Sequence, residues 1–270
     1  MQFRDDLALR LIIKKVRETT GINFGAYRGN FVKRRLRVRM HRNTVNTFGE
    51  YLKILNSNPE EYTLLLRDLT INYTKFFRDP DVFILFKNEI LKKIKSSKQI
   101  IRVWSAGCAT GEEPYSIAIA LLEAMQNSRV PISIKVYASD IDETALSEAK
   151  RGVYAVSKLE NLDKRLIRKY FIKLSEGYSI KEEVRNLVYF KNENLLSPLR
   201  YMSLDAIFCR NVLIYFSKEA QVDIFNKFYT YLKPSGLLII GKTESIPINM
   251  KNIFECIDER KRVYRKIMAI

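Results

Sequence analysis

The sequence predicts a small all-α domain at the N-terminus followed by an α/β domain with a doubly wound parallel sheet. Up to about residue 70, apolar side chains recur at helical spacing and no strand-like run occurs. After Lys98, short β-rich runs alternate with helical stretches, as they do in a parallel sheet covered by helices. A chain of 270 residues, 47% of them hydrophobic, can bury a core in each part.

The N-terminal domain, residues 1–70, is expected to hold four helices. The apolar stripe of the first one ends at Gly21. The second is strongly basic and keeps Leu36 and Met40 four residues apart on its buried side. The other two are expected around residues 48–55 and 62–69.

Residues 71–98 are expected to form a linker and a helix that contribute to a ligand site. The linker alternates polar and aromatic residues, as in NYTKFFRD at 72–79. Asp79 and Pro80 predict a helix start, because an acid caps the first turn and proline fits the first helical position.

The α/β domain is expected to span residues 99–270. Its predicted strands and helices alternate along the chain. The strands are 100–104, 132–138, 204–209 and 237–240, and the helices are 115–125, 143–150 and 218–232. A small inserted β-subdomain is expected at about 153–191, with a helix at 164–171 and strands at 178–180 and 187–190.

Several classes of protein are excluded by scarce residue types. Cys108, Cys209 and Cys256 are scattered and odd in number, so neither a disulfide framework nor a metal site is expected. The one histidine, His41, excludes a histidine base elsewhere in the chain. No secretory leader or apolar run of membrane-spanning length is present, so a soluble, cytoplasmic protein is expected.

The formal charge of +17 predicts an acidic or polyanionic partner. Charge alone leaves nucleic acid, an acidic protein surface and plain solubility open.

A glycine-containing loop at residues 107–111 joins a predicted strand to a helix. Gly107 and Gly111 allow the backbone to approach a ligand closely, although two glycines in an ordinary turn would look the same. Glu112 and Glu113 follow where a dinucleotide would place its pyrophosphate, so phosphate is disfavoured. A cationic ligand with an ammonium and a sulfonium, such as S-adenosylmethionine, fits these acids better.

Asp140 ends the next predicted strand. An acid in that place can accept hydrogen bonds from both ribose hydroxyls of a nucleoside. The alternative is that Asp140 merely caps the helix that follows.

Five sequence blocks carry a resemblance to a known family. They are NYTKFFRD (72–79), RVWSAGCATGEEPYS (102–116), ASDID (138–142), IFCRNVLIYF (207–216) and LKPSGL (232–237). With these blocks in this order, the chain resembles the CheR family of chemotaxis receptor methyltransferases, which methylate glutamate side chains. The resemblance implies a Rossmann-like fold that binds S-adenosylmethionine and releases S-adenosylhomocysteine.

The resemblance also implies roles for individual residues. Asn72, Thr74 and Arg78 would close over the cofactor, Glu113 would hold its methionine part, and Asp140 its ribose. Four residues would frame the adenine and the methyl-donor face: Asn194, Leu195, Asn211 and Val212. Arg78 and Tyr215 are assigned to the reaction centre.

The chemistry of a carboxylate acceptor agrees with these residue types. A glutamate has a reference pKa of about 4.3, so it is ionised at neutral pH and needs no general base. Arg78 can bind a carboxylate through two hydrogen bonds. The sequence leaves open whether this carboxylate belongs to the substrate or to the cofactor. Tyr215 either orients the nucleophile or simply packs.

The basic run of the second helix predicts a recognition surface. Its positive residues are Lys33, Arg34, Arg35, Arg37 and Arg39, with Arg42 nearby. A solvated face is the plain alternative, but the resemblance implies docking on the helical bundle of a receptor. The loop at 174–179 is short, so action without capture of a receptor tail peptide is expected. The protein is also expected to be a monomer.

The rival hypothesis is a nucleic-acid methyltransferase or an RNA-binding protein attracted to phosphate. Against an adenine-N6 enzyme, the sequence has Cys209-Arg210-Asn211-Val212 where an Asn-Pro-Pro-Tyr motif would be needed.

Overall fold

The computed structural model describes residues 2–94, 99–126, 128, 131–160, 162–198 and 202–267, with side chains from residue 5 onward. The chain forms two compact units. One comprises Met1–Ile71 and Ile214–Gln221, and the other comprises Asn72–Leu213 and Val222–Ile270. The end of the expected linker, 95–98, lies outside the described residues.

The first unit is helical, as predicted. Its helices are α1 (Gln2–Thr20), α2 (Gly29–Arg42), α3 (Phe48–Ser57) and α4 (Glu60–Leu69), with a 3-10 turn at Phe24–Ala26. Gly21 follows α1 with a φ of 73°, a left-handed conformation that glycine adopts at little cost. Thr47 and Glu50 form a reciprocal capping box that starts α3.

A segment from late in the chain belongs to the helical unit. The backbone N–H of Arg28 donates to the carbonyl of Tyr215 at 2.9 Å, and that of Ser217 donates to Ala26 at 2.9 Å. The rings of Tyr27 and Phe216 stack with centroids 4.7 Å apart. The sequence placed this segment within 99–270, because pairing between residues so far apart leaves no local pattern.

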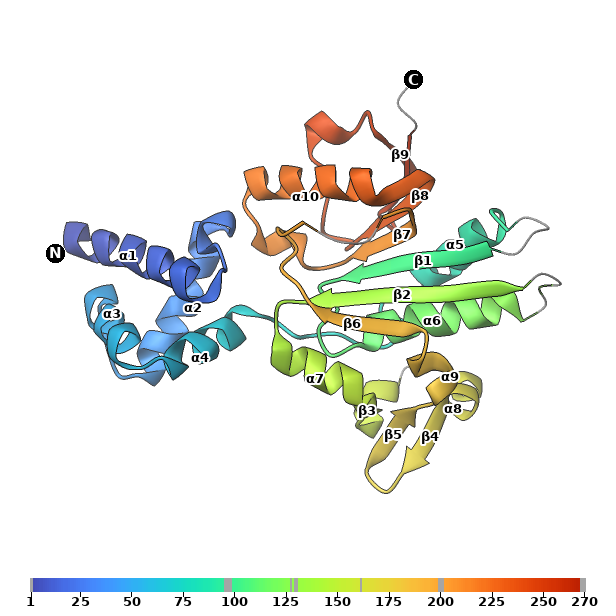
Figure 1. Cartoon of the computed structure of the whole chain (residues 1–270), viewed down its shortest axis with the longest axis horizontal. Coiled ribbons are helices and arrows are strands. Elements are labelled where there is room, and N and C mark those ends of the chain that lie inside the picture. The colour runs from blue at the N-terminus through green and yellow to red at the C-terminus, as the bar shows by residue number, and fades with distance from the viewer. Residues whose placement is uncertain are drawn as a thin grey trace. The chain divides into compact units, whose positions relative to one another are not determined.

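The second unit is built on a seven-stranded sheet in the order β6-β2-β1-β7-β8-β10-β9 (Figure 1). Its strands are β1 (Gln99–Ala106), β2 (Ile132–Asp140), β6 (Val188–Asn192), β7 (Leu204–Cys209), β8 (Leu232–Ile240), β9 (Phe254–Asp258) and β10 (Val263–Lys266). The first five in this order are parallel, which confirms the doubly wound α/β fold. The antiparallel strands β9 and β10 were not predicted.

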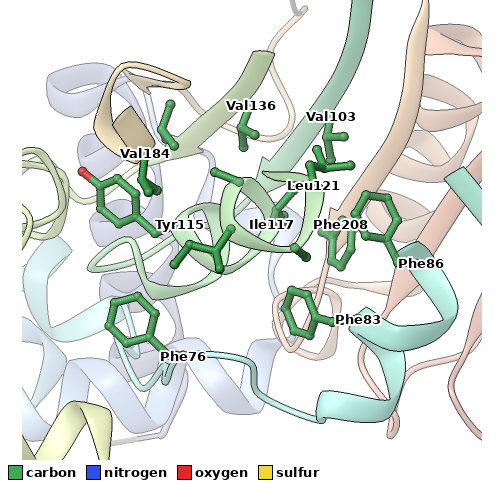
Figure 2. Close-up of a cluster of buried hydrophobic side chains, with 14 of the residues drawn as sticks. Phe76, Phe83, Phe86, Val103, Tyr115, Ile117, Leu121, Val136, Val184 and Phe208 are labelled. Carbon is green, nitrogen blue, oxygen red and sulfur yellow. The ribbon is translucent and has the colours of Figure 1, made fainter. Parts of the chain in front are cut away.

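Helices cover both faces of this sheet. The main ones are α5 (Pro80–Leu91), α6 (Glu112–Met125), α7 (Glu143–Arg151) and α10 (Lys218–Tyr231). Neighbouring side chains of a strand point to opposite faces. Val103 belongs to the cluster shared with α5 and α6, whereas the ring of Trp104 meets Phe228 of α10 at 5.7 Å. Figure 2 shows Ile117 of α6 and Phe83 of α5 gathered on the Val103 side.

A second, three-stranded sheet has the order β3-β5-β4. Its strands are β3 (Val153–Tyr154), β4 (Phe171–Leu174) and β5 (Gly177–Ile180), near α8 (Lys164–Tyr170) and α9 (Glu182–Arg185). The strand expected at 187–190 within this insertion is wrongly placed, because it is β6 and pairs with β2 in the large sheet. Short 3-10 turns complete the chain at Val156–Leu159, Leu213–Tyr215 and Ile248–Met250.

Among the residues described, no helix combines the length and the apolar character needed to cross a bilayer.

Candidate active site

The candidate site lies at the carboxyl edge of the parallel strands. From β1 the chain continues to β2 on one side, whereas β7 lies on the other side of β1. Ligands of open α/β sheets bind at such a switch point, outside the carboxyl ends of the strands. The loops concerned follow Ala106, Asp140, Asn192, Cys209 and Ile240.

The loop after β1 closes tightly against β2 and the loop after β7. The N–H groups of Gly107 and Cys108 both donate to the carbonyl of Ser139, at 2.8 and 3.0 Å. Gly107 has a φ of 79°, and a Cβ there would lie 2.5 Å from Cγ2 of Val212. The structure therefore brings together Gly107 and Val212, two predicted cofactor residues that are distant in sequence.

The carboxylate of Asp140 is held from two sides. Oδ2 accepts from the N–H of Ala109 at 2.8 Å, and Oδ1 accepts from the N–H of Asp142 at 2.9 Å. Burial raises its pKa, and these hydrogen bonds oppose the rise. The capping alternative is wrong, because Asp142 is the residue that accepts from Thr144 and Ala145 at the start of α7. A carboxylate has about four acceptor positions, so the backbone contacts of Asp140 leave acceptor capacity for a ligand.

The two adjacent acids of α6 have different partners. Glu112 is fully buried and pairs with Lys158, its Oε1 lying 2.7 Å from Nζ. Glu113 accepts from the hydroxyl of Ser105 at 2.7 Å, and its Oε2 lies 3.6 Å from Nη1 of Arg210. Lys158 thus neutralises the charge of Glu112 within the protein.

The pKa of Glu113 is raised by burial. The charge of Arg210 is the largest influence that opposes this rise, followed by the hydrogen bond from Ser105. Glu113 is thus a largely buried carboxylate, with a side chain 13% exposed, whose ionisation depends on nearby cations.

The linker reaches this edge through Asn72 and Thr74. Asn72 donates to Oδ2 of Asp142 at 2.7 Å, and the N–H of Asp142 in turn donates to Asp140. The carbonyl of Thr74 accepts from Lys158, the partner of Glu112, at 3.3 Å.

Arg78 and Asp79 complete the linker. The guanidinium of Arg78 lies over the ring of Tyr73, 5.7 Å from its centroid, while its carbonyl accepts from Arg210 at 2.9 Å. Asp79 precedes α5 but makes no capping hydrogen bond, contrary to expectation. Its carboxylate instead pairs with Arg210 and with Lys242, and its backbone adopts a φ of 59°.

The loops after β6 and β7 hold the remaining predicted cofactor residues. Oδ1 of Asn194 accepts from the N–H of Leu196 at 2.9 Å, and Leu195 is buried. The N–H of Glu193 donates to the carbonyl of Asp140, which places this loop beside the end of β2. Asn211 adopts a φ of 61° and donates its N–H to Glu244 at 3.0 Å.

Sequence reasoning missed four polar residues that support these groups. They are Ser105, Asp142, Arg210 and Glu244. Each lies at or just beyond the end of a parallel strand, and this position is the sequence pattern by which they could have been found. Among the described residues, no three His, Cys, Asp or Glu side chains gather as metal ligands would.

Tyr215 belongs to the helical unit, with the basic helix α2. Its ring lies 4.8 Å from that of Phe31, and its backbone carbonyl binds Arg28. A cavity of about 590 Å³ opens here. Its lining consists of Arg28, Gly29, Asn30, Phe31, Arg34, Ile214 and Tyr215.

The basic residues of α2 divide by burial. Arg34 and Arg37 are exposed, and neither pairs with a carboxylate within the described part of the chain. Arg35 is half-buried over the ring of Phe31, and Lys33 lies 4.0 Å from Asp6.

Arg39 does not belong to a recognition surface. It is only 5% exposed, and its Nε and Nη2 donate to Glu61 at 2.8 and 2.7 Å. Nη1 reaches Asp68 at 3.0 Å, and Tyr51 also donates to Glu61. The expected role of Arg39 in docking is wrong, because its positive charge is neutralised inside the helical unit.

This combination of a parallel sheet, a glycine loop and a strand-end acid defines an enzyme of the class that binds a nucleoside cofactor. The family model described as the CheR methyltransferase, SAM binding domain, matches residues 72–263. The model of the CheR methyltransferase all-alpha domain matches residues 7–70. The chain is therefore a methyltransferase whose cofactor is S-adenosylmethionine, as the sequence predicted.

The chain matches curated relatives in sequence over most of their length. The chain is 37% identical to a chemotaxis protein methyltransferase of Borreliella burgdorferi, over 91% of this chain and 90% of the relative. It is 36% identical to that of Salmonella typhimurium, over 89% and 84%. Chemotaxis protein methyltransferase 2 of Pseudomonas aeruginosa is 37% identical, over 84% and 82%. The chain belongs to the CheR methyltransferase family and serves chemotaxis.

Proposed function

We propose that this enzyme transfers the methyl group of S-adenosylmethionine to glutamate carboxylates of chemotaxis receptors in the cytoplasm. The products are glutamate methyl esters and S-adenosylhomocysteine. The observation that carries the proposal is the chemical type of the side chains at the carboxyl edge of the parallel sheet. Acids and arginines gather there, while the one histidine of the sequence, His41, belongs to α2. Such a site suits an acceptor that is already deprotonated, as a carboxylate is.

The same geometry supports the roles that we propose for the cofactor residues. In this proposal Glu113 receives the ammonium of the methionine part, and Asp140 accepts from the ribose hydroxyls with its remaining lone pairs. The adenine and the methyl-donor face meet the loops after β6 and β7. The residues proposed there are Asn194, Leu195, Asn211 and Val212, with Gly107 opposite Val212 and Asn72 and Thr74 on the linker side.

The reaction needs alignment and no proton transfer. The bound cofactor supplies a methyl carbon made electrophilic by the sulfonium. An oxygen of the substrate carboxylate would accept this methyl group, and the electron pair of the carbon–sulfur bond would stay with the departing S-adenosylhomocysteine. Arg78 and Tyr215 are proposed to orient the reacting groups, a contribution worth up to roughly 7–11 kcal/mol in well-aligned reactions.

Recognition of the substrate is assigned to the helical unit. Lys33, Arg34, Arg35 and Arg37 give α2 a positive surface suited to an acidic helical bundle. The cavity beside α2 is lined by Arg28, Arg34 and Tyr215, so it can receive an acidic side chain.

The small sheet bears on how the receptor is reached. β4 and β5 are joined by two residues only, Ser175 and Glu176. We infer that the enzyme acts without capturing a receptor tail peptide. Tight binding of an isolated tail peptide, measured by calorimetry, would contradict this inference.

Labelled methyl transfer tests the proposed function. The enzyme is incubated with methyl-labelled cofactor and, in separate reactions, a receptor cytoplasmic domain, tRNA or DNA. Label on the receptor that is released as methanol by base is the expected result, because carboxyl methyl esters hydrolyse readily. Label in nucleic acid alone would support the rival hypothesis and overturn the proposal.

A further inference from the structure

A buried arginine at the end of β7 connects the linker to the cofactor loops. The side chain of Arg210 is only 1% exposed. Its Nη1 donates to the carbonyl of Arg78 at 2.9 Å and lies 3.6 Å from Oε2 of Glu113. Its Nη2 pairs with the carboxylate of Asp79. One guanidinium therefore contacts two segments, each of which carries a residue of the proposed site.

The backbone of the linker at Phe77–Asp79 has a conformation that other contacts must stabilise. Phe77 and Asp79 have φ values of 48° and 59°, a left-handed conformation that is unfavourable for residues other than glycine. Such a conformation persists only where the surroundings fix it. Arg210 supplies two of the contacts that do so, one to the backbone of Arg78 and one to the side chain of Asp79.

We propose that Arg210 is a positioning residue that keeps Glu113 ionised for the cofactor's ammonium and holds Arg78 in place for transfer. The first part rests on the proposed role of Glu113; the second rests on the linker contacts alone. Arg210 itself need touch neither the cofactor nor the substrate.

The surroundings of Glu113 explain why one arginine decides its charge. Ser105 of β1 donates to it, and the cations nearby are Arg210 and Arg78. Glu244, from the loop after β8, opposes ionisation, and Cys108 and Cys209 also face Glu113 as buried thiols. Since burial already raises the pKa of Glu113, loss of Arg210 raises it further and leaves more of the carboxyl protonated at neutral pH.

Calorimetry of cofactor binding tests the charge. The dissociation constant of S-adenosylmethionine is measured at pH 6 and pH 8 for the wild type and Arg210→Gln. At each pH, the constant of the variant is divided by that of the wild type. This ratio is expected to be about tenfold larger at pH 6 than at pH 8, since an opposite charge shifts a carboxyl pKa by one unit or more. Taking the ratio cancels the titration of the cofactor's own amino group.

Arg265→Gln is the matched control. Arg265 donates to Glu89, another glutamate with a buried side chain, at 2.8 Å, but it lies in β10, where it pairs with Leu237 of β8. This variant is expected to bind the cofactor as the wild type does at both pH values. Equal ratios at pH 6 and pH 8 for Arg210→Gln would overturn the charge role.

Two further variants test positioning, even if Arg210→Gln does not fold. Arg210→Lys keeps the charge but loses the fork that reaches Arg78 and Asp79 together. Asp79→Asn removes the charge from one of the two linker contacts and leaves Glu113 with its arginine. In both variants, kcat for methyl transfer should fall about tenfold or more. The variant-to-wild-type ratio of dissociation constants at pH 6 should stay within about threefold of that ratio at pH 8. Wild-type kcat in both would overturn the positioning role.

Glu113→Gln separates this inference from the proposal on which it rests. Wild-type cofactor binding by Glu113→Gln would refute the assignment of Glu113, and with it the charge role of Arg210. The receptor substrate is not tested here, because binding is measured without a methyl acceptor.

Discussion

Arg37 and Arg39 lie two residues apart on α2, yet burial separates their roles. Arg37 is exposed, whereas Arg39 is enclosed by Glu61 and Asp68. A run of like charges in a sequence cannot show which of its members face inward. The acids that neutralise Arg39 come from α4, and only the folded structure brings them close.

Removal of Arg39 is expected to destabilise the protein. Arg39→Met leaves Glu61 buried without its cation, which costs about 3–5 kcal/mol. Urea unfolding measures this loss, with Arg37→Met as the control, expected to stay within about 0.5 kcal/mol of the wild type. Equal stability of the two variants would contradict the burial of Arg39.

Arg78→Ala is expected to abolish methyl transfer and leave the fold intact. The guanidinium of Arg78 contacts the ring and carbonyl of Tyr73, and it is the backbone of Arg78 that binds Arg210. The substitution therefore spares the backbone contact. Transfer to a receptor domain and the thermal unfolding midpoint are measured together. Normal transfer by the folded variant would refute the site assignment.

At the residue scale, the sequence predicted groups whose role follows from their place in a local motif. Gly107 and Glu113 follow the end of β1, Asp140 ends β2, and the segments around these residues meet in the structure. Arg210 and Glu244 were missed because their partners lie far along the chain. Contacts of that kind leave no spacing to recognise.

At the element scale, helical periodicity located the helices well. α2, α3 and α4 lie where the apolar stripes placed them. The sequence predicts the strand at 187–190 within the insertion, whereas β6 pairs with β2, because a short strand has no sequence pattern that indicates which sheet it joins. β9 and β10 were not foreseen, since their run from residue 254 to 266 mixes charged and apolar residues without a clear alternation.

The exposed face of α2 is expected to control receptor affinity. Charge reversal in the double variant Arg34→Glu/Arg37→Glu should weaken receptor binding about tenfold or more, because like charges then face the acidic bundle. Surface plasmon resonance with a receptor cytoplasmic domain measures the change. Cofactor affinity serves as the control and should be unaltered. Unchanged receptor binding would show that α2 is only a solvated face.

The contact between α6 and α8 is expected to fail in acid. Burial disfavours the ionised form of Glu123, but hydrogen bonds from Lys169, Tyr170 and Arg165 outweigh it and lower the pKa of Glu123 to about 2. A carboxyl with a lowered pKa adds stability above its unfolded value of 4.5, and this stability is lost as pH falls towards 2.

The loss amounts to roughly 2–3 kcal/mol between pH 5 and pH 2. Urea unfolding across this range should show a shallower decline for Glu123→Gln than for the wild type. Glu148→Gln, at an exposed position of α7, is the control and should follow the wild type. Parallel curves for all three proteins would argue against the cluster around Glu123.

At the scale of the whole molecule, the charge of +17 is expected to act on the partner more than on the cofactor. Raising salt from about 50 to 300 mM shortens the range of surface electrostatics and should weaken receptor binding about tenfold. Cofactor affinity should change less than about threefold, because its acids are buried. Receptor affinity that is independent of salt would contradict electrostatic docking.

The helical unit is discontinuous in sequence, and this has a practical consequence. Ile214–Gln221 returns to it from between β7 and the rest of α10. A gene fragment that starts at residue 72 would leave Phe216, 3% exposed in the intact chain, without the ring of Tyr27 to cover it. A fragment that stops at residue 71 would lack Tyr215. Neither half is therefore a self-contained module, and exchanges between relatives should transplant residues 1–71 and 214–221 together.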